Sequence, residues 1–157
     1  MKLLFIVLLI EWLGFSTAVA SPPWSFGRLA SESDVIAIVQ YKSSSDVATT
    51  IDYANGVFQQ KMTTFKVLSV LKKKQGLEFD ERTIPVAHFW IPEGVPTAGS
   101  FDFFSFDESE LESHMSQKVL SKERIYLLYL KVSDSGEFVP VRGQSDALGA
   151  IFQVSKF

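Results

Sequence analysis

Residues 47–71 read VATTIDYANGVFQQKMTTFKVLSVL, and this stretch decides the fold class. Asn55-Gly56 separates two β-prone runs, which predicts a tight hairpin because both residues tolerate positive φ. The apolar positions of the second run change phase, from even numbers to odd and back again (Phe58, Met62; Phe65, Val67; Leu68, Val70). A regular strand cannot do this and keep one face inward. We therefore predict a bulged or strongly coiled strand of the kind that wraps around a small barrel.

Further strands are predicted on both sides of this hairpin, at 35–41, 83–90, 125–130 and 138–141. The third of these, IYLLYL, is apolar at every position and predicts a central strand covered on both faces. The serine-rich residues 42–46 predict a loop between the first strand and the hairpin. Residues 148–154 are expected to close the chain as a strand or a short helix.

Two helices are also predicted. Residues 25–33 favour a short helix near the start of the domain. Ser105 to Glu108 matches the S-x-x-E capping box, and an apolar stripe at i, i+4 and i+8 follows it (Leu111, Met115, Val119). We expect an amphipathic helix from about Phe106 to Leu120. Five main strands with a helix between the third and fourth follow the order of an OB-fold, so the predicted fold is mainly β: a five-stranded OB-like β-barrel with one inserted amphipathic helix.

The first 20 residues have the three parts of a secretory signal peptide. A positive Met1-Lys2 precedes an apolar run from Leu3 to Ile10, and a small-residue stretch ends in A-x-A at Ala20. A membrane anchor is the alternative, but Glu11 interrupts the run well before the roughly 20 apolar residues that a spanning helix needs. We therefore expect residues 1–20 to be removed, residues 21–157 to form a single domain, and the protein to be secreted or periplasmic without stable membrane insertion.

Composition narrows the function classes. The 157 residues are 46% hydrophobic, carry a net charge of −3 and include no cysteine. The absence of cysteine excludes disulfide scaffolds, thiol nucleophiles and cysteine-bound metal sites, and an exported domain without disulfides is typical of bacteria. The acidic balance argues against nucleic acid as a partner, since such binding depends on neutralising phosphates.

The strand patterns resemble those of small exported bacterial proteins with a netrin-like, TIMP-like OB barrel. The resemblance extends over about two thirds of the mature chain, and the stretches that match best are 33–39, 64–72, 125–130 and 138–144. It implies the fold. Eukaryotic members of this group inhibit metalloproteases through an N-terminal cysteine that chelates zinc. This chain departs from them at that point, because its expected mature start is Ser21-Pro22-Pro23.

Histidines are the first candidates for chemistry, and there are two, His88 and His114. Glu110 and His114 have the i, i+4 spacing that places two zinc ligands on one helix face, but no H-E-x-x-H or comparable signature is present. A Ser-His-Asp hydrolase would need a nucleophile held against a base, and no G-x-S-x-G occurs. Ser145-Asp146 is explained by turn chemistry. We therefore expect no catalytic residues, no metal and no cofactor.

Aromatic residues flank the Pro/Gly-rich stretch 91–100. Phe101 to Phe106 holds four phenylalanines in six residues, more than a short segment buries on one side. We interpret Trp90, Phe101 and Phe103 as candidates for a partner-binding or self-association patch. The alternative is that they plug an open end of the barrel as core residues.

The function expected from these observations is an exported, non-enzymatic binding or inhibitor-like module that recognises a protein or cell-surface partner. Two alternatives stay open. One is a small metal- or histidine-dependent hydrolase that uses His88 or His114. The other is a structural component of the cell envelope.

Overall fold

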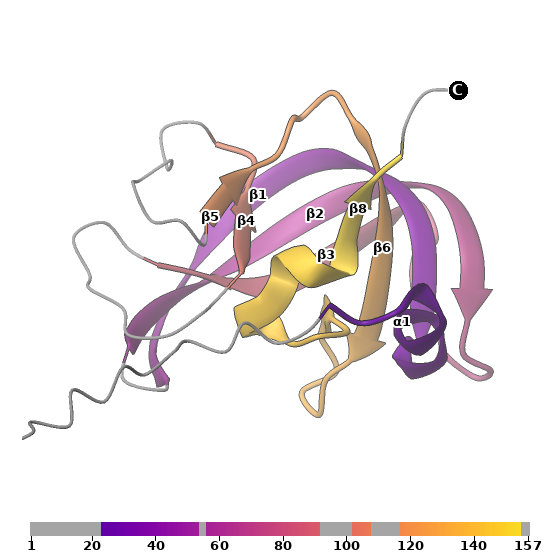
Figure 1. The fold of residues 1–157 in the computed structure, drawn as a ribbon, viewed down its shortest axis with the longest axis horizontal. Helices are drawn as coiled ribbons and strands as arrows, with labels where there is room; N and C mark the ends of the chain where they lie inside the picture. Colours follow the sequence, from indigo (N-terminus) through magenta and orange to yellow (C-terminus); the bar gives the residue numbers. More distant parts are fainter. Residues whose placement is uncertain (1–22, 54–55, 92–101, 108–116, 155–157) are drawn as a thin grey trace, which may run out of the picture.

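The structure is a computed structural model that describes residues 23–53, 56–91, 102–107 and 117–154. Along the chain the elements are α1 (Phe26–Glu32), β1 (Val35–Tyr53), β2 (Gly56–Lys73), β3 (Thr83–Trp90), β4 (Phe103–Ser105), β5 (Gln117–Val119), β6 (Ile125–Val132), β7 (Phe138–Pro140), the 3-10 helix η2 (Gln144–Ala150) and β8 (Ile151–Gln153) (Figure 1). The predicted signal peptide lies outside these ranges. Within them, no helix combines the length and the apolar character needed to cross a membrane.

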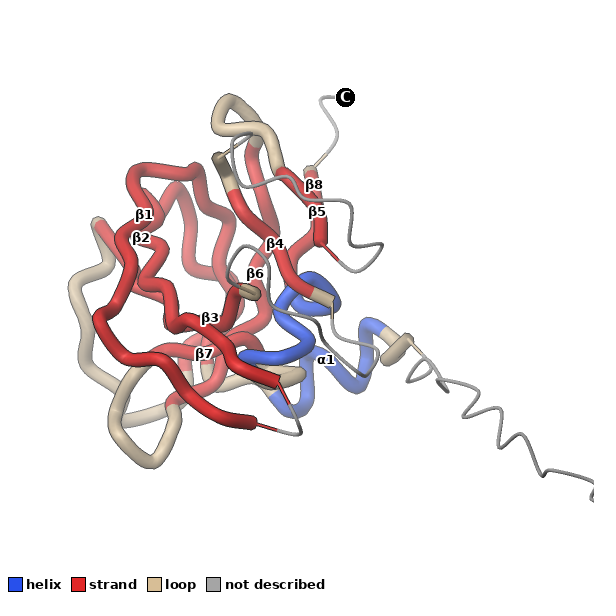
Figure 2. Tube along the Cα trace, turned by 90° about the vertical axis from the view of Figure 1, so that its left-hand side faces the viewer, coloured by secondary structure: helices blue, strands red, loops and turns tan. Residues whose placement is uncertain are grey.

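Five strands form a closed ring. Their order is β1-β2-β3-β7-β6, and β6 pairs again with β1. The β3–β7 pairing is parallel and the other four are antiparallel. β1, β2 and β3 follow one another as neighbours and β6 returns beside β1, which is a Greek-key arrangement. Figure 2 shows the strands wrapped around one another with both helices on one side. The mainly β class is confirmed.

β6 is the central strand that its sequence predicts. It pairs with β1 from Ile125 to Leu130, with β7 from Leu130 to Val132, and with β8 from Tyr126 to Leu128. The last segment, expected to be a strand or a short helix, contains parts of both, since η2 ends at Ala150 and β8 begins at Ile151.

The β1–β2 hairpin is confirmed, with Tyr53 opposite Gly56. The loop predicted at 42–46 is wrong, because β1 continues through it and Ser43 to Asp46 pair with β2. The side chains of Ser43, Ser44 and Ser45 are exposed, so no burial of apolar side chains holds this part of the strand. The backbone bonds supplied by β2 decide the conformation here.

The phase change in β2 is explained by bulges, as predicted. The register skips Leu71 between the pairs Ile36↔Lys72 and Ala37↔Val70, and it skips Leu68 in the same way two residues further along β1. Each skipped leucine is an extra residue on β2. Both side chains are exposed, Leu68 by 44% and Leu71 by 57%. The bulges therefore keep the neighbouring inward positions in phase with the core.

The helix predicted from Phe106 to Leu120 is wrong at both ends, while residues 108–116 lie outside the described part of the chain. Phe106 is in a bend, and residues 117–119 form β5, which pairs with β4. The Ser105 hydroxyl accepts from the Asp107 N–H, two residues on, at 3.1 Å. Phe104 and Phe106 are buried in the main core.

The short helix predicted at 25–33 is confirmed as α1. The Ser25 hydroxyl caps it by accepting from the Arg28 N–H at 3.2 Å, and Leu29 is its buried residue. Phe26 stays 61% exposed, although its ring contacts Phe152 with a centroid distance of 5.1 Å.

Candidate functional site

Two of the three aromatic residues predicted for a binding patch are buried. Trp90 is 4% exposed and Phe103 is fully buried, and both belong to one core cluster with Phe58, Phe89 and Ile91. The ring centroids of Phe58 and Phe103 lie 5.7 Å apart. Phe101 lies outside the described residues. The structure therefore supports the alternative that Trp90 and Phe103 are core residues, because a side chain packed among aromatic rings offers no surface to a partner.

Polar groups inside the ring form a chain across three strands. The side-chain oxygens of Ser44 on β1 and Thr63 on β2 lie 2.9 Å apart, and the Thr63 oxygen lies 2.8 Å from Nε2 of His88 on β3. His88 Nδ1 lies 3.3 Å from the carbonyl oxygen of Phe89. Since that carbonyl only accepts, Nδ1 carries the proton and Nε2 accepts from Thr63. The Thr63 oxygen then accepts from Ser44.

This environment fixes what His88 can do. The imidazole is 1% exposed and stacks on Phe104 with a centroid distance of 4.2 Å. Burial, with a further contribution from the nearby Lys61 ammonium, lowers the pKa of His88 to about 4, so the ring is neutral at pH 7. Its hydroxyl neighbour, Thr63, is itself only 1% exposed. A nucleophile buried to this degree cannot meet a substrate, so the pair has the character of a structural hydrogen bond.

Lys61 is a buried charged residue beside this chain. Strand pairing places it between Asp46 on β1 and His88 on β3. Its Nζ lies 2.9 Å from a carboxylate oxygen of Asp46, and the two side chains are 6% and 56% exposed. The Nζ atom also lies 5.9 Å from the ring centroid of Trp90. The Asp46 carboxylate offsets the cost of burying the ammonium group.

A cavity of about 210 Å³ opens at this point and is called here the polar pocket. Among the described residues, its lining combines hydroxyl groups, two carboxylates and one ammonium group (Tyr41, Ser44, Ser45, Asp46, Lys61, Ser105, Asp107). β1 and β2 supply five of these residues, and β4 with the residues after it supplies the other two. The ring of Tyr41 stacks on Phe106 with a centroid distance of 4.4 Å, so one of its faces is already covered.

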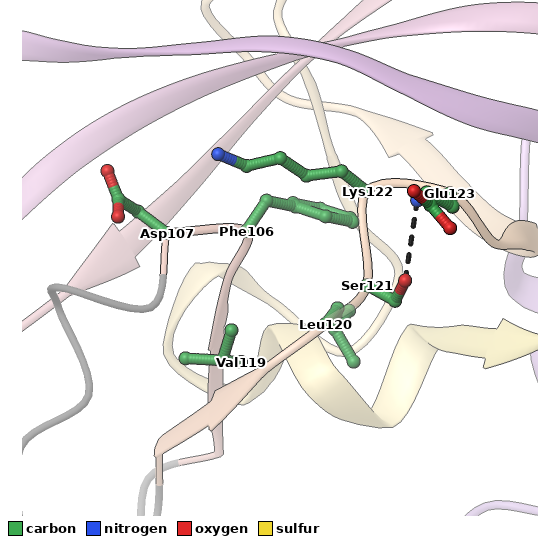
Figure 3. A pocket seen from close by; sticks show the side chains of 7 residues that line it. All are labelled: Phe106, Asp107, Val119, Leu120, Ser121, Lys122 and Glu123. Carbon is green, nitrogen blue, oxygen red and sulfur yellow. Dashed lines mark hydrogen bonds between the residues drawn. The ribbon is translucent and has the colours of Figure 1, made fainter.

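A larger hollow of about 600 Å³ lies next to the polar pocket and is lined by the residues drawn in Figure 3 (Phe106, Asp107, Val119, Leu120, Ser121, Lys122, Glu123). Lys122 extends along Phe106 in this view, and its Nζ lies 5.8 Å from the ring centroid of Tyr41. The hollow borders both ends of 108–116, which are not described. We therefore assign no site to it.

Among the described residues, the other sequence candidates are not brought together. Asp146 pairs with Arg142 four residues before it, and burial raises the pKa of Asp146. Its partner is thus an arginine and not a histidine. In the described part of the chain, no three His, Cys, Asp or Glu side chains cluster in a way that could hold a metal ion. His114 and Glu110 lie outside that part.

Sequence reasoning missed Ser44, Lys61 and Thr63. One signal was available, because Lys61 and Thr63 stand at the same alternate positions as the buried Phe65. Polar residues in the inward phase of a strand need polar partners.

A scan against models of known protein families finds no match, and a search of curated proteins finds no significant one.

Proposed function

We propose that this chain is an exported, non-enzymatic binding module that recognises a protein or cell-surface partner. The observation that carries the proposal is the contrast between the polar groups around His88, which are enclosed, and the carboxylates of the polar pocket, which are open to solvent. The imidazole of His88 is enclosed and hydrogen-bonded to Thr63 and Phe89, whereas the polar pocket presents two exposed carboxylates, Asp46 and Asp107. Charges and hydroxyl groups at the mouth of a small pocket favour recognition.

The fold we propose for this module is an OB-like barrel of the netrin-like, TIMP-like kind. The closed ring of five strands and its Greek-key order support it, since an OB-fold is a five-stranded Greek-key barrel. Eukaryotic members of that group chelate zinc through an N-terminal cysteine. This chain has no cysteine, so its mode of binding differs from theirs. Recognition is then carried by side chains of the barrel.

The experiment that tests the proposal has a binding arm. The exported protein is immobilised and exposed to envelope and secreted fractions of the producing cells, and retained proteins are competed with free protein. We expect one or more partners whose retention is saturable and competed. Retention that free protein does not compete would contradict the proposal.

The second arm tests the hydrolase alternative. Wild-type protein and His88→Gln are assayed side by side with ester, amide and glycoside substrates. We expect no turnover above buffer for either protein. Turnover by the wild type that disappears in His88→Gln would contradict the binding-module proposal and support the histidine-dependent hydrolase.

A further inference from the structure

We propose that two copies of this chain associate through the edge of β1, so that residues 43–45 of one copy pair antiparallel with residues 45–43 of the other. The inference goes beyond the proposed function, because the partner is a second copy and not a foreign molecule. It is carried by the position of β1 in the sheet, by the exposed residues along its edge and by a charge pattern that is complementary to itself.

The two edges of β1 are paired to different extents. β1 pairs with β2 from Val35 to Tyr53, but with β6 only from Val35 to Gln40. Beyond Gln40 no described strand pairs with this second edge, and Figure 1 shows β6 far from the hairpin end of β1. In an edge strand, N–H and C=O groups point away from the sheet and can pair with another strand. The second half of β1 therefore offers a site for strand addition.

The part of this edge that is best suited to pairing is short. Residues 43–46 are in continuous register with β2, between one irregularity before Ser43 and another after Asp46. All residues from Lys42 to Asp46 are exposed, and the three in the middle are serines. Small side chains let a second backbone approach to the spacing of about 4.8 Å between neighbouring strands.

Charges at the two ends of this run select the partner. Lys42 carries a positive charge, Asp46 carries a negative one, and three serines separate them. An antiparallel second copy centred on Ser44 places Lys42 of each copy opposite Asp46 of the other, which makes two favourable cross-strand pairs. A parallel copy in the same register would place like charges opposite each other. The pattern therefore fits a second copy related by a two-fold axis.

Asp46 can take part although it already holds Lys61. Its Oδ1 atom lies 2.9 Å from Lys61 Nζ, and 56% of the Asp46 side chain is exposed. A carboxylate has about four lone-pair sites, so the ammonium group of Lys42 in the other copy can also donate to it. Because Lys61 weakens the attraction, the charges set the register of the two copies and the backbone hydrogen bonds supply most of the affinity.

The expected dimer is weak and reversible. Residues 42–46 of each copy would be in contact, whereas a stable interface takes about 20–30 residues a side. Each copy also carries a net charge of −3, which opposes association. We therefore expect the protein to be a monomer at micromolar concentration and to dimerise at millimolar concentration.

Disulfide cross-linking tests the geometry, because the chain contains no cysteine and a single introduced thiol has no competitor. With Ser44 on the two-fold axis, the Cα atoms of the two copies at this position lie about 4.5–5.5 Å apart, within the range that a disulfide spans. Ser43→Cys is the matched control. Position 43 lies opposite position 45, so the two copies of position 43 are about 7–8 Å apart.

Each variant is oxidised with glutathione disulfide at millimolar protein concentration, and the covalent dimer is followed on a non-reducing gel. We expect Ser44→Cys to cross-link at least about fivefold faster than Ser43→Cys, since only its thiols lie within disulfide range. Equal rates, or no covalent dimer from Ser44→Cys, would overturn the proposal.

The charge pattern is tested in the Ser44→Cys protein. Lys42→Glu places like charges opposite each other at both ends of the run, and we expect it to slow cross-linking about threefold to tenfold, as for two exposed ion pairs. Lys131→Glu is the control, because Lys131 is an exposed lysine on β6 and its substitution makes the same change in net charge. Equal slowing by both substitutions would overturn the proposal, because net charge and not strand pairing would then control association.

The wild-type protein supplies a measurement without substitutions. Its translational diffusion is measured by NMR from micromolar to millimolar concentration, together with hydrogen exchange of the backbone amides. We expect diffusion to slow as the concentration rises, and exchange to slow at the amides of 43–45 that point away from β2. A protein that stays monomeric at millimolar concentration would overturn the proposal. Retention of a foreign partner does not enter these measurements, so the proposed function is tested independently.

Discussion

The Thr63 hydroxyl donates to Nε2 of His88 over 2.8 Å, in an interior where both residues are 1% exposed. Because Thr63 also accepts from Ser44, it is the middle member of a chain that starts at an exposed serine. Removing the Thr63 hydroxyl leaves the buried Nε2 of His88 without its donor. Removing the Ser44 hydroxyl only leaves the Thr63 hydroxyl with one partner fewer.

The first prediction follows from that asymmetry. Thr63→Val keeps the shape of the side chain but deprives His88 Nε2 of its donor, and we expect it to lower the free energy of unfolding by about 1–3 kcal/mol. Ser44→Ala is the matched control, and we expect a loss below about 1 kcal/mol because Ser44 is exposed. Urea unfolding at pH 7 measures both. Equal losses in the two variants would contradict the structural role of Thr63.

The second prediction concerns acid. The pKa of His88 is lowered from 6.5 to about 4 in the folded protein, so the unfolded chain takes up the proton first as the pH falls. The stability contributed by neutral His88 is present above pH 6.5 and is lost between about 6.5 and 4. Protonation would also place a second positive charge beside Lys61.

A full shift of this size is worth on the order of 3 kcal/mol. We expect the free energy of unfolding, measured by urea titration from pH 7.5 to 4, to fall by up to that amount in the wild type. His88→Gln is less stable at pH 7.5 but should show a flatter profile in this range. A profile that is unchanged by the substitution would assign the acid sensitivity to other groups.

The third prediction contrasts two leucines. Leu128 on β6 is 2% exposed within the main core, and Leu68 on a β2 bulge is 44% exposed. We expect Leu128→Ala to cost about 2–5 kcal/mol of unfolding free energy and Leu68→Ala less than about 0.5 kcal/mol. Denaturant melts of the two variants measure the difference. A loss below about 1 kcal/mol at Leu128 would mean that β6 does not occupy the centre of the core.

The fourth prediction decides the role of the aromatic segment. Phe103 is fully buried against Phe58, so Phe103→Ser should lower the free energy of unfolding by at least about 3 kcal/mol, as for other buried phenylalanines. Phe26→Ser is the matched control, because Phe26 is 61% exposed, and its melting temperature should stay within a few degrees. A Phe103→Ser protein with wild-type stability would mean that Phe103 lies at the surface and not in the core.

The fifth prediction tests export. The A-x-A pattern ends at Ala20, so the mature protein should begin at Ser21. Intact-mass measurement of the protein recovered outside the cytoplasm checks this directly. A species that retains residues 1–20 in a membrane fraction would favour the anchor instead.

The sequence determined the elements whose signal is local. Asn55-Gly56 marked the place of the hairpin, although the register makes Gly56 the first residue of β2, opposite Tyr53. The phase changes in 57–71 specified bulges, because inward positions must stay in phase with the core. The apolar run at 125–130 specified the central strand, since no amphipathic element buries both of its faces.

Only the tertiary structure decided the rest. Residues 42–46 are a strand because β2 supplies partners for their backbone, and residues 117–119 are a strand because β4 supplies partners for theirs. The polar chain and the polar pocket bring together residues that are up to 66 positions apart, from Tyr41 to Asp107. Such a set leaves no local pattern, because hydrogen bonds and ion pairs between strands depend on register and closure, and these are fixed when the ring forms.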